Sequence, residues 1–132
     1  LKSILWDILE EAEKKETTEE KLETVWKEHV RLIEKTRILP RIIFSDTLHT
    51  GKNREKLKDV VFFYQDGVKK IFEEGIKKGE LTECDPDVLT RLFLGGILFS
   101  ALKWLLSGES YNLMEDIEKV FKTFKKTCFR EK

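Results

Sequence analysis

The sequence has few cysteines and no excess of charge of either sign, and each shortage excludes a class of protein. Only Cys84 and Cys128 are cysteines among 132 residues, and they lie too far apart for a metal-site spacing or a disulfide framework. The 25 basic and 25 acidic residues cancel, whereas a nucleic-acid-binding surface is markedly basic. We therefore expect a reduced cytoplasmic protein with no metal, no cofactor and no DNA-reading surface in this chain.

Strand patterns and targeting segments are also missing. No segment alternates convincingly with period two, and the apolar run 42–44 is too short to carry a sheet. We expect no signal peptide in this sequence. The most apolar stretch, 92–106, contains Ser100 and Lys103, and we expect it to be too short for a bilayer, which needs roughly 20 apolar residues. Because the chain begins at Leu1 and its only methionine is Met114, we expect a fragment without its N-terminal part.

Apolar residues recur at helical spacing and predict an all-α bundle of about six helices joined by short loops. Thr17 with Glu20 three residues later is a capping-box signature, and Asp85 followed by Pro86 is a helix start. We expect helices at 1–15, from Thr17 through Ile33, at 39–48, at 53–78, at 85–107 and from Asn112 to the C-terminal region.

Catalytic motifs are missing from these helices. An enzyme needs a nucleophile beside a base, paired carboxylates on an apolar face, a metal cluster or a glycine-rich phosphate loop. The sequence shows none of these patterns, and its Gly95-Gly96 pair falls inside a helix. We therefore expect that the chain is not an enzyme.

His29 interrupts an apolar face of the second helix, beside Trp26, Val30 and Ile33. One interpretation is a core histidine bonded to a neighbouring carbonyl. The other is a polar anchor that orients a ligand inside an apolar cavity. The aromatic residues of the chain allow both a filled core and a lined pocket, and the sequence leaves this choice open.

The expected helix 85–107 is apolar nearly all round, so it must be covered on most sides. Gly96 and Ser100 share a face with Phe93 and Trp104, and small residues let two helices approach closely. Packing inside one chain and self-association both explain this face. We favour self-association, in which the last two helices form a four-helix interface with a second copy about a two-fold axis.

The most specific pattern is an ordered series of short motifs. Gly79-Glu80-Leu81 forms a "GEL" turn, Asp85-Pro86-Asp87 starts a helix, Leu94-Gly95-Gly96 lies within it, and Trp104-Leu105-Leu106-Ser107-Gly108 ends it. Leu39-Pro40 adds a proline near the start of a short helix. In this order, the motifs resemble the C-terminal, ligand-binding and dimerisation domain of TetR-like bacterial transcriptional regulators. The likeness covers nearly the whole chain, and 1–15 resembles the helix that joins the two domains of such regulators.

The resemblance implies that 1–132 is one effector-binding and homodimerisation domain of a ligand-responsive regulator, expected to be a repressor. The N-terminal helix-turn-helix domain of the family is absent from this chain, so DNA would be bound only through that missing part. The implied effector is small and apolar or amphipathic, and no membrane partner is implied. The implied ligand-binding residues are Trp26, His29, Val30, Ile33, Phe44, Leu48, Phe63 and Tyr64. The implied dimer residues are Phe93, Gly96, Ser100, Trp104, Ile117, Phe121 and Phe124.

An alternative without a DNA role is a helical dimer that binds lipid-like molecules or a protein partner. Upstream sequence with a helix-turn-helix pattern would favour the regulator over this alternative.

Overall fold

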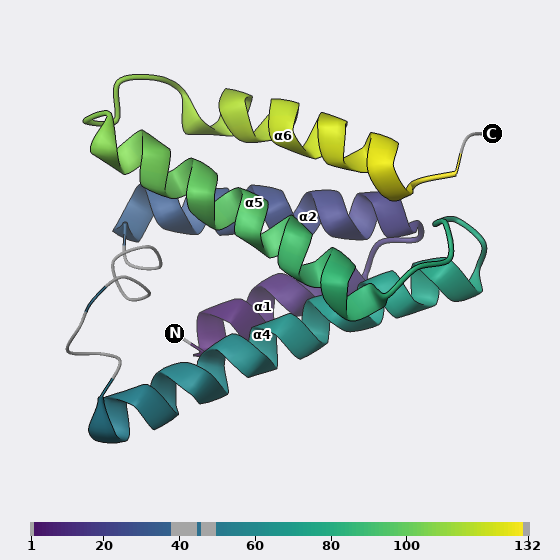
Figure 1. Ribbon diagram of the computed structural model, residues 1–132, viewed down its shortest axis with the longest axis horizontal. Coiled ribbons are helices and arrows are strands. Elements are labelled where there is room, and N and C mark those ends of the chain that lie inside the picture. The colour runs from purple at the N-terminus through teal and green to yellow at the C-terminus, as the bar shows by residue number, and fades with distance from the viewer. Residues whose placement is uncertain (1, 38–44, 46–49, 131–132) are drawn as a thin grey trace.

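The computed structural model describes residues 2–37, 45 and 50–130, and within them it contains helices and no extended strand (Figure 1). The all-α prediction is confirmed. The expected helix 39–48, with the predicted ligand-binding residues Phe44 and Leu48, lies outside the described residues. The described helices are α1 (Lys2–Glu13), α2 (Thr18–Thr36), α4 (Gly51–Lys77), α5 (Pro86–Leu106) and α6 (Leu113–Cys128).

Side-chain caps set the starts of three of these helices. Thr17 Oγ1 accepts a hydrogen bond from the Glu20 backbone N–H at 3.1 Å, and the Glu20 carboxylate accepts one from the Thr17 N–H at 3.3 Å. The Asp85 carboxylate accepts from the Asp87 N–H at 2.9 Å, with Pro86 as the first residue of α5. Asn112 caps α6 in the same way. Each cap satisfies backbone donors that the first turn leaves free, which fixes where the helix begins.

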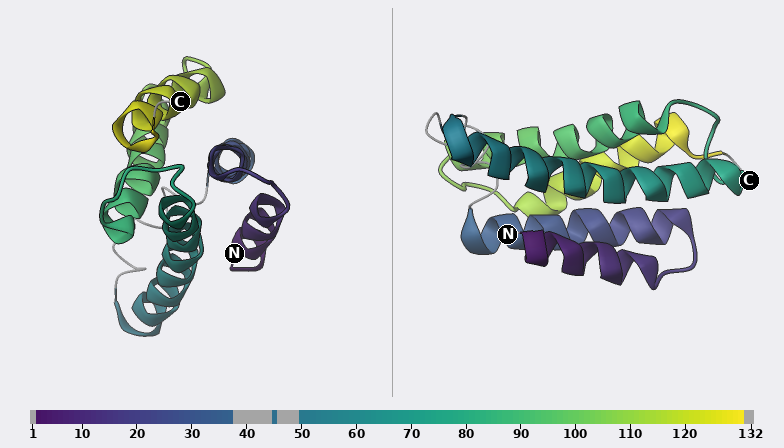
Figure 2. Two further views of the ribbon diagram at one scale, coloured as in Figure 1. Left: turned by 90° about the vertical axis from the view of Figure 1, so that its right-hand side faces the viewer. Right: turned by 90° about the horizontal axis from the view of Figure 1, so that it is seen from below.

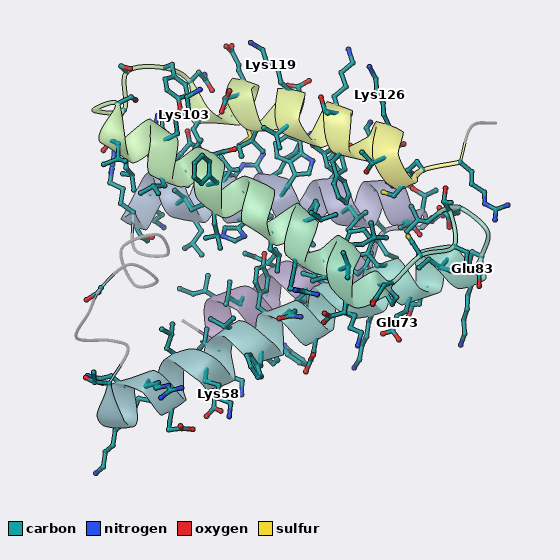
Figure 3. All side chains as sticks on the ribbon, in the orientation of Figure 1. Lys58, Glu73, Glu83, Lys103, Lys119 and Lys126 are labelled. Atoms are coloured by element: carbon teal, nitrogen blue, oxygen red, sulfur yellow. The ribbon has the colours of Figure 1, made fainter. Side chains whose placement is uncertain are left out.

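The helices form two layers, with α1 and α2 in one and α4, α5 and α6 in the other (Figure 2). Helix α2 is the centre of the packing because it contacts all four of the other described helices. Its apolar residues Leu22, Val25, Trp26, Val30, Leu32 and Ile33 are buried. Charged side chains such as Lys58 and Glu73 on α4, and Lys119 and Lys126 on α6, point away from the bundle (Figure 3).

An aromatic cluster joins α4, α5 and α6. Its members are Phe72, Phe93, Phe121 and Phe124, whose contacting rings have centroids 5.5–6.5 Å apart. Trp26 of α2 joins the cluster through Phe121, at 5.5 Å between ring centroids. Burial of one large apolar side chain contributes about 1.5–3 kcal/mol, so this cluster is a main source of the stability that holds α4, α5 and α6 together, and Trp26 links it to the other layer.

Helix α5 is long and apolar enough to cross a bilayer, and it is the one such helix in the described part of the chain. It has 21 residues, and its most apolar stretch has a mean hydropathy of 1.5. The expectation concerned 92–106 alone, whereas the whole helix Pro86–Leu106 has the length and composition of a membrane-spanning helix. The core helix of a soluble protein passes the same test, and α5 packs on α2, α4 and α6.

Candidate functional site

His29 and Tyr64 form a polar pair inside the bundle, between α2 and α4. The His29 Nδ1 and the Tyr64 Oη lie 3.0 Å apart. The two rings meet edge to face, with centroids 5.4 Å apart and an interplanar angle of 64°. His29 is 3% exposed and Tyr64 is 6% exposed. His29 is therefore a buried histidine, as the first interpretation has it, but its partner is a side chain rather than a carbonyl. The second interpretation, a polar anchor for a ligand, stays a prediction.

Burial determines the protonation of this pair. Loss of water lowers the pKa of His29 to about 4 and raises the pKa of Tyr64 above its usual value. Both groups are therefore neutral at physiological pH. The second ring nitrogen of His29, Nε2, is buried and has no hydrogen-bond partner among the described residues. An unpaired buried polar atom costs about 1–3 kcal/mol, so this nitrogen marks a position where a bound molecule could supply a partner.

The other predicted ligand-binding residues lie in three different surroundings. Val30 and Ile33 are fully buried on α2 beside His29 in sequence. Trp26 packs on Phe121 of α6, and its indole Nε1 is also buried, with no partner in the part of the chain that the structure describes. Phe63 is half-buried on α4 and stacks on Trp6 of α1, with ring centroids 6.0 Å apart. The structure therefore pairs His29 with Tyr64 and places Trp26 and Phe63 in separate aromatic contacts.

Two apolar depressions lie near these elements. A narrow cleft of about 20 Å³ runs between α2, α5 and α6, lined by Trp26, Leu92, Phe93, Ile97, Ile117, Val120, Phe121 and Phe124. Its volume is about that needed for one water molecule. A surface groove of about 250 Å³ lies between α1 and α2, with Ile4, Ile8 and Leu32 in its lining.

Most of the predicted dimer residues lie inside the chain. Phe93 and Trp104 of α5 and Ile117 and Phe121 of α6 are buried, whereas Gly96, Ser100 and Phe124 are half-buried. Gly96 faces α6 of its own chain, because a Cβ built on it would lie 3.4 Å from Val120 Cγ1. Packing of α6 on α5 within one chain therefore explains the small residue at Gly96.

The outer side of α5 carries a different row of apolar residues, here called the α5 stripe. Its most exposed members are Leu92 at 60%, Phe99 at 71% and Leu106 at 79%. Gly95 lies between them, and a Cβ built on it would meet nothing within 4 Å. The complete stripe is Val88, Leu92, Gly95, Phe99, Leu102 and Leu106.

Sequence reasoning missed the α5 stripe, although a signal for it exists. The members alternate in spacings of four and three residues, which is the spacing of a helix seam that packs on a second helix. The many apolar residues on the other faces of α5 hide this spacing.

Metal chemistry has no support in the described residues, which contain no group of three or more His, Cys, Asp or Glu side chains that could hold an ion. The site is therefore a neutral hydrogen-bonding pair in apolar surroundings. It can bind and orient a ligand, and the pair alone offers no nucleophile or charged acid–base group.

Comparisons with known proteins agree with the helical fold. Residues 15–106 match a family described as "Tetracyclin repressor-like, C-terminal domain". The transcriptional regulator FadR from Bacillus subtilis in complex with stearoyl-CoA superposes with a TM-score of 0.80, 21% identity and coverage of 92% of this chain and 67% of that chain. A candidate fatty acid metabolism regulator from Clostridium perfringens gives a TM-score of 0.79, 22% identity and coverage of 92% and 66%.

A transcriptional regulator of the TetR/AcrR family from Thermobifida fusca superposes with a TM-score of 0.69, 19% identity and coverage of 92% and 67%. No curated protein matches the chain at a significant level. The chain spans about two thirds of the length of these solved structures, and at such identities the likeness shows a shared fold.

Proposed function

The chain belongs to the tetracyclin repressor-like C-terminal domain family, and from this membership we propose that it is the effector-binding and homodimerisation part of a ligand-responsive transcriptional regulator. The DNA-reading helix-turn-helix of such a regulator would lie in the third of the length that this chain does not span. The proposed role is binding rather than catalysis, and the proposed location is the bacterial cytoplasm, where DNA and effector meet.

The α5 stripe is the observation that supports the proposed homodimer. Reading two half-sites of an operator requires two copies of the DNA-reading part, held roughly 34–36 Å or more apart. An exposed row of large apolar residues on one helix is unfavourable in water and favourable in an isologous interface. We place the α5 stripe at the centre of that interface, with Gly96, Ser100 and Phe124 at its edge. Phe93, Trp104, Ile117 and Phe121 would support the stripe from within each chain.

The proposed effector is a long-chain acyl thioester. The Bacillus subtilis structure is a complex with stearoyl-CoA, and the interior around α2 offers the apolar surroundings that an acyl chain needs. Trp26, His29, Val30, Ile33, Phe63 and Tyr64 are the described residues that we assign to this effector. Binding would stabilise one of two dimer states, and it would shift DNA affinity through its differential affinity for those states.

Sedimentation equilibrium of the 132-residue chain tests the dimer. We expect a dimer, and we expect Phe99→Glu to convert it to monomer because a carboxylate would be buried in the apolar interface. Ser3→Glu is the matched control, since it adds the same charge to an exposed position of α1, which does not pack on α5. A Phe99→Glu variant that remains dimeric would exclude the α5 stripe as the interface.

Titration with stearoyl-CoA tests the effector. We expect saturable binding and a rise in melting temperature, because a ligand that binds only the folded state stabilises it. Coenzyme A without the acyl chain is the control and should give a much smaller rise. Equal effects of the two compounds would contradict an acyl-binding interior.

A further inference from the structure

The hydrogen atoms of the His29–Tyr64 pair can be placed by counting donors and acceptors. A neutral histidine has one N–H donor and one nitrogen acceptor, and a tyrosine has one O–H donor. The described contact of both residues is the 3.0 Å bond between Nδ1 and Oη. Two arrangements are therefore open: Tyr64 donates to Nδ1, or Nδ1–H donates to Tyr64.

The first arrangement leaves fewer buried groups unpaired. If Tyr64 donates to Nδ1, its O–H is satisfied and only the Nε2–H of His29 lacks a partner. If Nδ1–H donates instead, the tyrosine O–H and the Nε2 lone pair are both without a partner. Because each unpaired buried polar group is costly, His29 takes the form that carries its hydrogen on Nε2. The pair thus presents one N–H donor that lacks an acceptor.

The N–H donor of His29 is uncharged, and this restricts which ligand groups it can bind. Burial holds the pKa of His29 at about 4, so at pH 7 about one molecule in 1,000 carries the imidazolium. Lys21 is the one buried cation among the described residues, and it lies eight positions away on α2, in ion pairs with Glu13 and Glu74. A carboxylate beside Nε2 would therefore be buried without a counter-charge, which is strongly unfavourable.

We propose, on the basis of the function proposed above, that His29 is a specificity-determining residue whose Nε2–H donates a hydrogen bond to the uncharged carbonyl oxygen of the acyl effector. Tyr64 is the positioning residue, because its O–H holds the histidine in the form that carries hydrogen on Nε2. The site thereby favours a thioester or ester carbonyl over the carboxylate of the free acid.

A pair of ligands that differ only at the carbonyl tests this assignment. Stearoyl-CoA has the carbonyl, and S-octadecyl-CoA is the thioether in which a methylene replaces it. Isothermal titration of the full chain with each ligand gives a ratio of dissociation constants. We expect the wild-type chain to bind stearoyl-CoA roughly tenfold more tightly than the thioether, since the thioether leaves the donor unpaired.

His29→Phe should reduce this ratio to about one while leaving the affinity for the thioether little changed, because the apolar ring remains but the donor is gone. His29→Gln, whose amide can donate near the position of Nε2, should keep part of the ratio. Tyr111→Phe is the control: it removes a buried hydroxyl, in the turn before α6, that has no partner among the described residues, and it should leave the ratio unchanged. Nitrogen-15 NMR of the wild-type chain should show the hydrogen of His29 on Nε2, and Tyr64→Phe should mix the two forms and lower the ratio.

The outcomes separate the two proposals. Binding of both ligands with a wild-type ratio near one would overturn the role of His29 and leave the acyl effector standing. A ratio that persists in His29→Phe, or a hydrogen found on Nδ1, would overturn it as well. Failure of both ligands to bind would overturn the proposed effector itself. If His29→Phe does not fold, the Tyr64→Phe ratio and the NMR spectrum still decide the assignment.

Discussion

Thr18 at the start of α2 packs directly against Gly75 near the end of α4. A Cβ built on Gly75 would lie 2.7 Å from Thr18 Cγ2 and 2.8 Å from Leu81 Cδ1, closer than real contacts allow. At the same corner, the Glu80 carboxylate accepts a hydrogen bond from the Thr18 N–H at 3.0 Å. The two layers of the bundle therefore meet at a glycine because the packing leaves no room for any side chain.

Gly75→Ala should destabilise the chain, although alanine is the better helix former. Alanine gains about 1 kcal/mol in helix propensity, but overpacking a filled core costs about 1–3 kcal/mol, and Thr18 and Leu81 are both buried. We expect a net loss of about 1 kcal/mol in the free energy of urea unfolding. Thr18→Ala should recover part of this loss in the double variant. Equal losses with and without Thr18→Ala would show that the contact is not the cause.

The stability of the chain should fall in acid through His29. Its pKa is about 4 in the folded state, against about 6.5 for an unburied histidine. Between these values the unfolded chain binds the proton more readily, so the free energy of unfolding falls as pH decreases from 6.5 to 4, by roughly 3 kcal/mol from this residue. Urea unfolding at a series of pH values should show this slope in the wild type.

His29→Gln is the control for that slope, because the remaining titratable groups are the same in both chains. The difference in unfolding free energy between wild type and variant should decrease on acidification and level off above about pH 6.5. A difference that stays constant with pH would mean that water or a negative charge stabilises the protonated form of His29 in the folded chain.

The capping box of α2 should contribute measurably to stability. Thr17→Ala removes the acceptor for the Glu20 N–H, and loss of such a cap costs about 1 kcal/mol. For a domain of this size we expect the melting temperature to fall by about 4 °C at constant protein concentration. Thr123→Ala, at an exposed position within α6, is the matched control and should not lower it. Equal shifts would mean that Thr17 acts only through helix propensity.

Local signals allowed the helix starts to be predicted from the sequence. The caps at Thr17, Asp85 and Asn112 involve residues only two or three positions apart, so the sequence contains all that the contact needs. The pairing of His29 with Tyr64 joins positions 35 residues apart. Helical spacing predicts that His29 and Tyr64 each lie on an inner face of a helix. It does not predict which residues of two inner faces contact each other.

The orientation of α5 could not be predicted for a different reason. A helix with one apolar face shows its buried side through its period, but α5 is apolar almost all round, so no period separates Phe93 and Trp104, which are buried, from Leu92 and Phe99, which are exposed. Tertiary packing decides which face of α5 is buried. The exposed face differs from the face that carries Phe93 and Trp104 among the predicted dimer residues.

Cys84 and Cys128 should differ sharply in their reactivity with a thiol reagent. Cys84 is exposed in the turn before α5, whereas Cys128 is 1% exposed at the end of α6, and burial raises the pKa of its thiol to about 11. The thiolate is the reactive form, so at pH 8 we expect one fast reaction with Ellman's reagent and a second at the rate at which the end of α6 opens. Cys84→Ser should remove the fast reaction and Cys128→Ser should keep it. The Cys128 carbonyl accepts a hydrogen bond from the Thr82 N–H at 2.8 Å. Two fast reactions in the wild type would show that this contact does not keep the end of α6 closed.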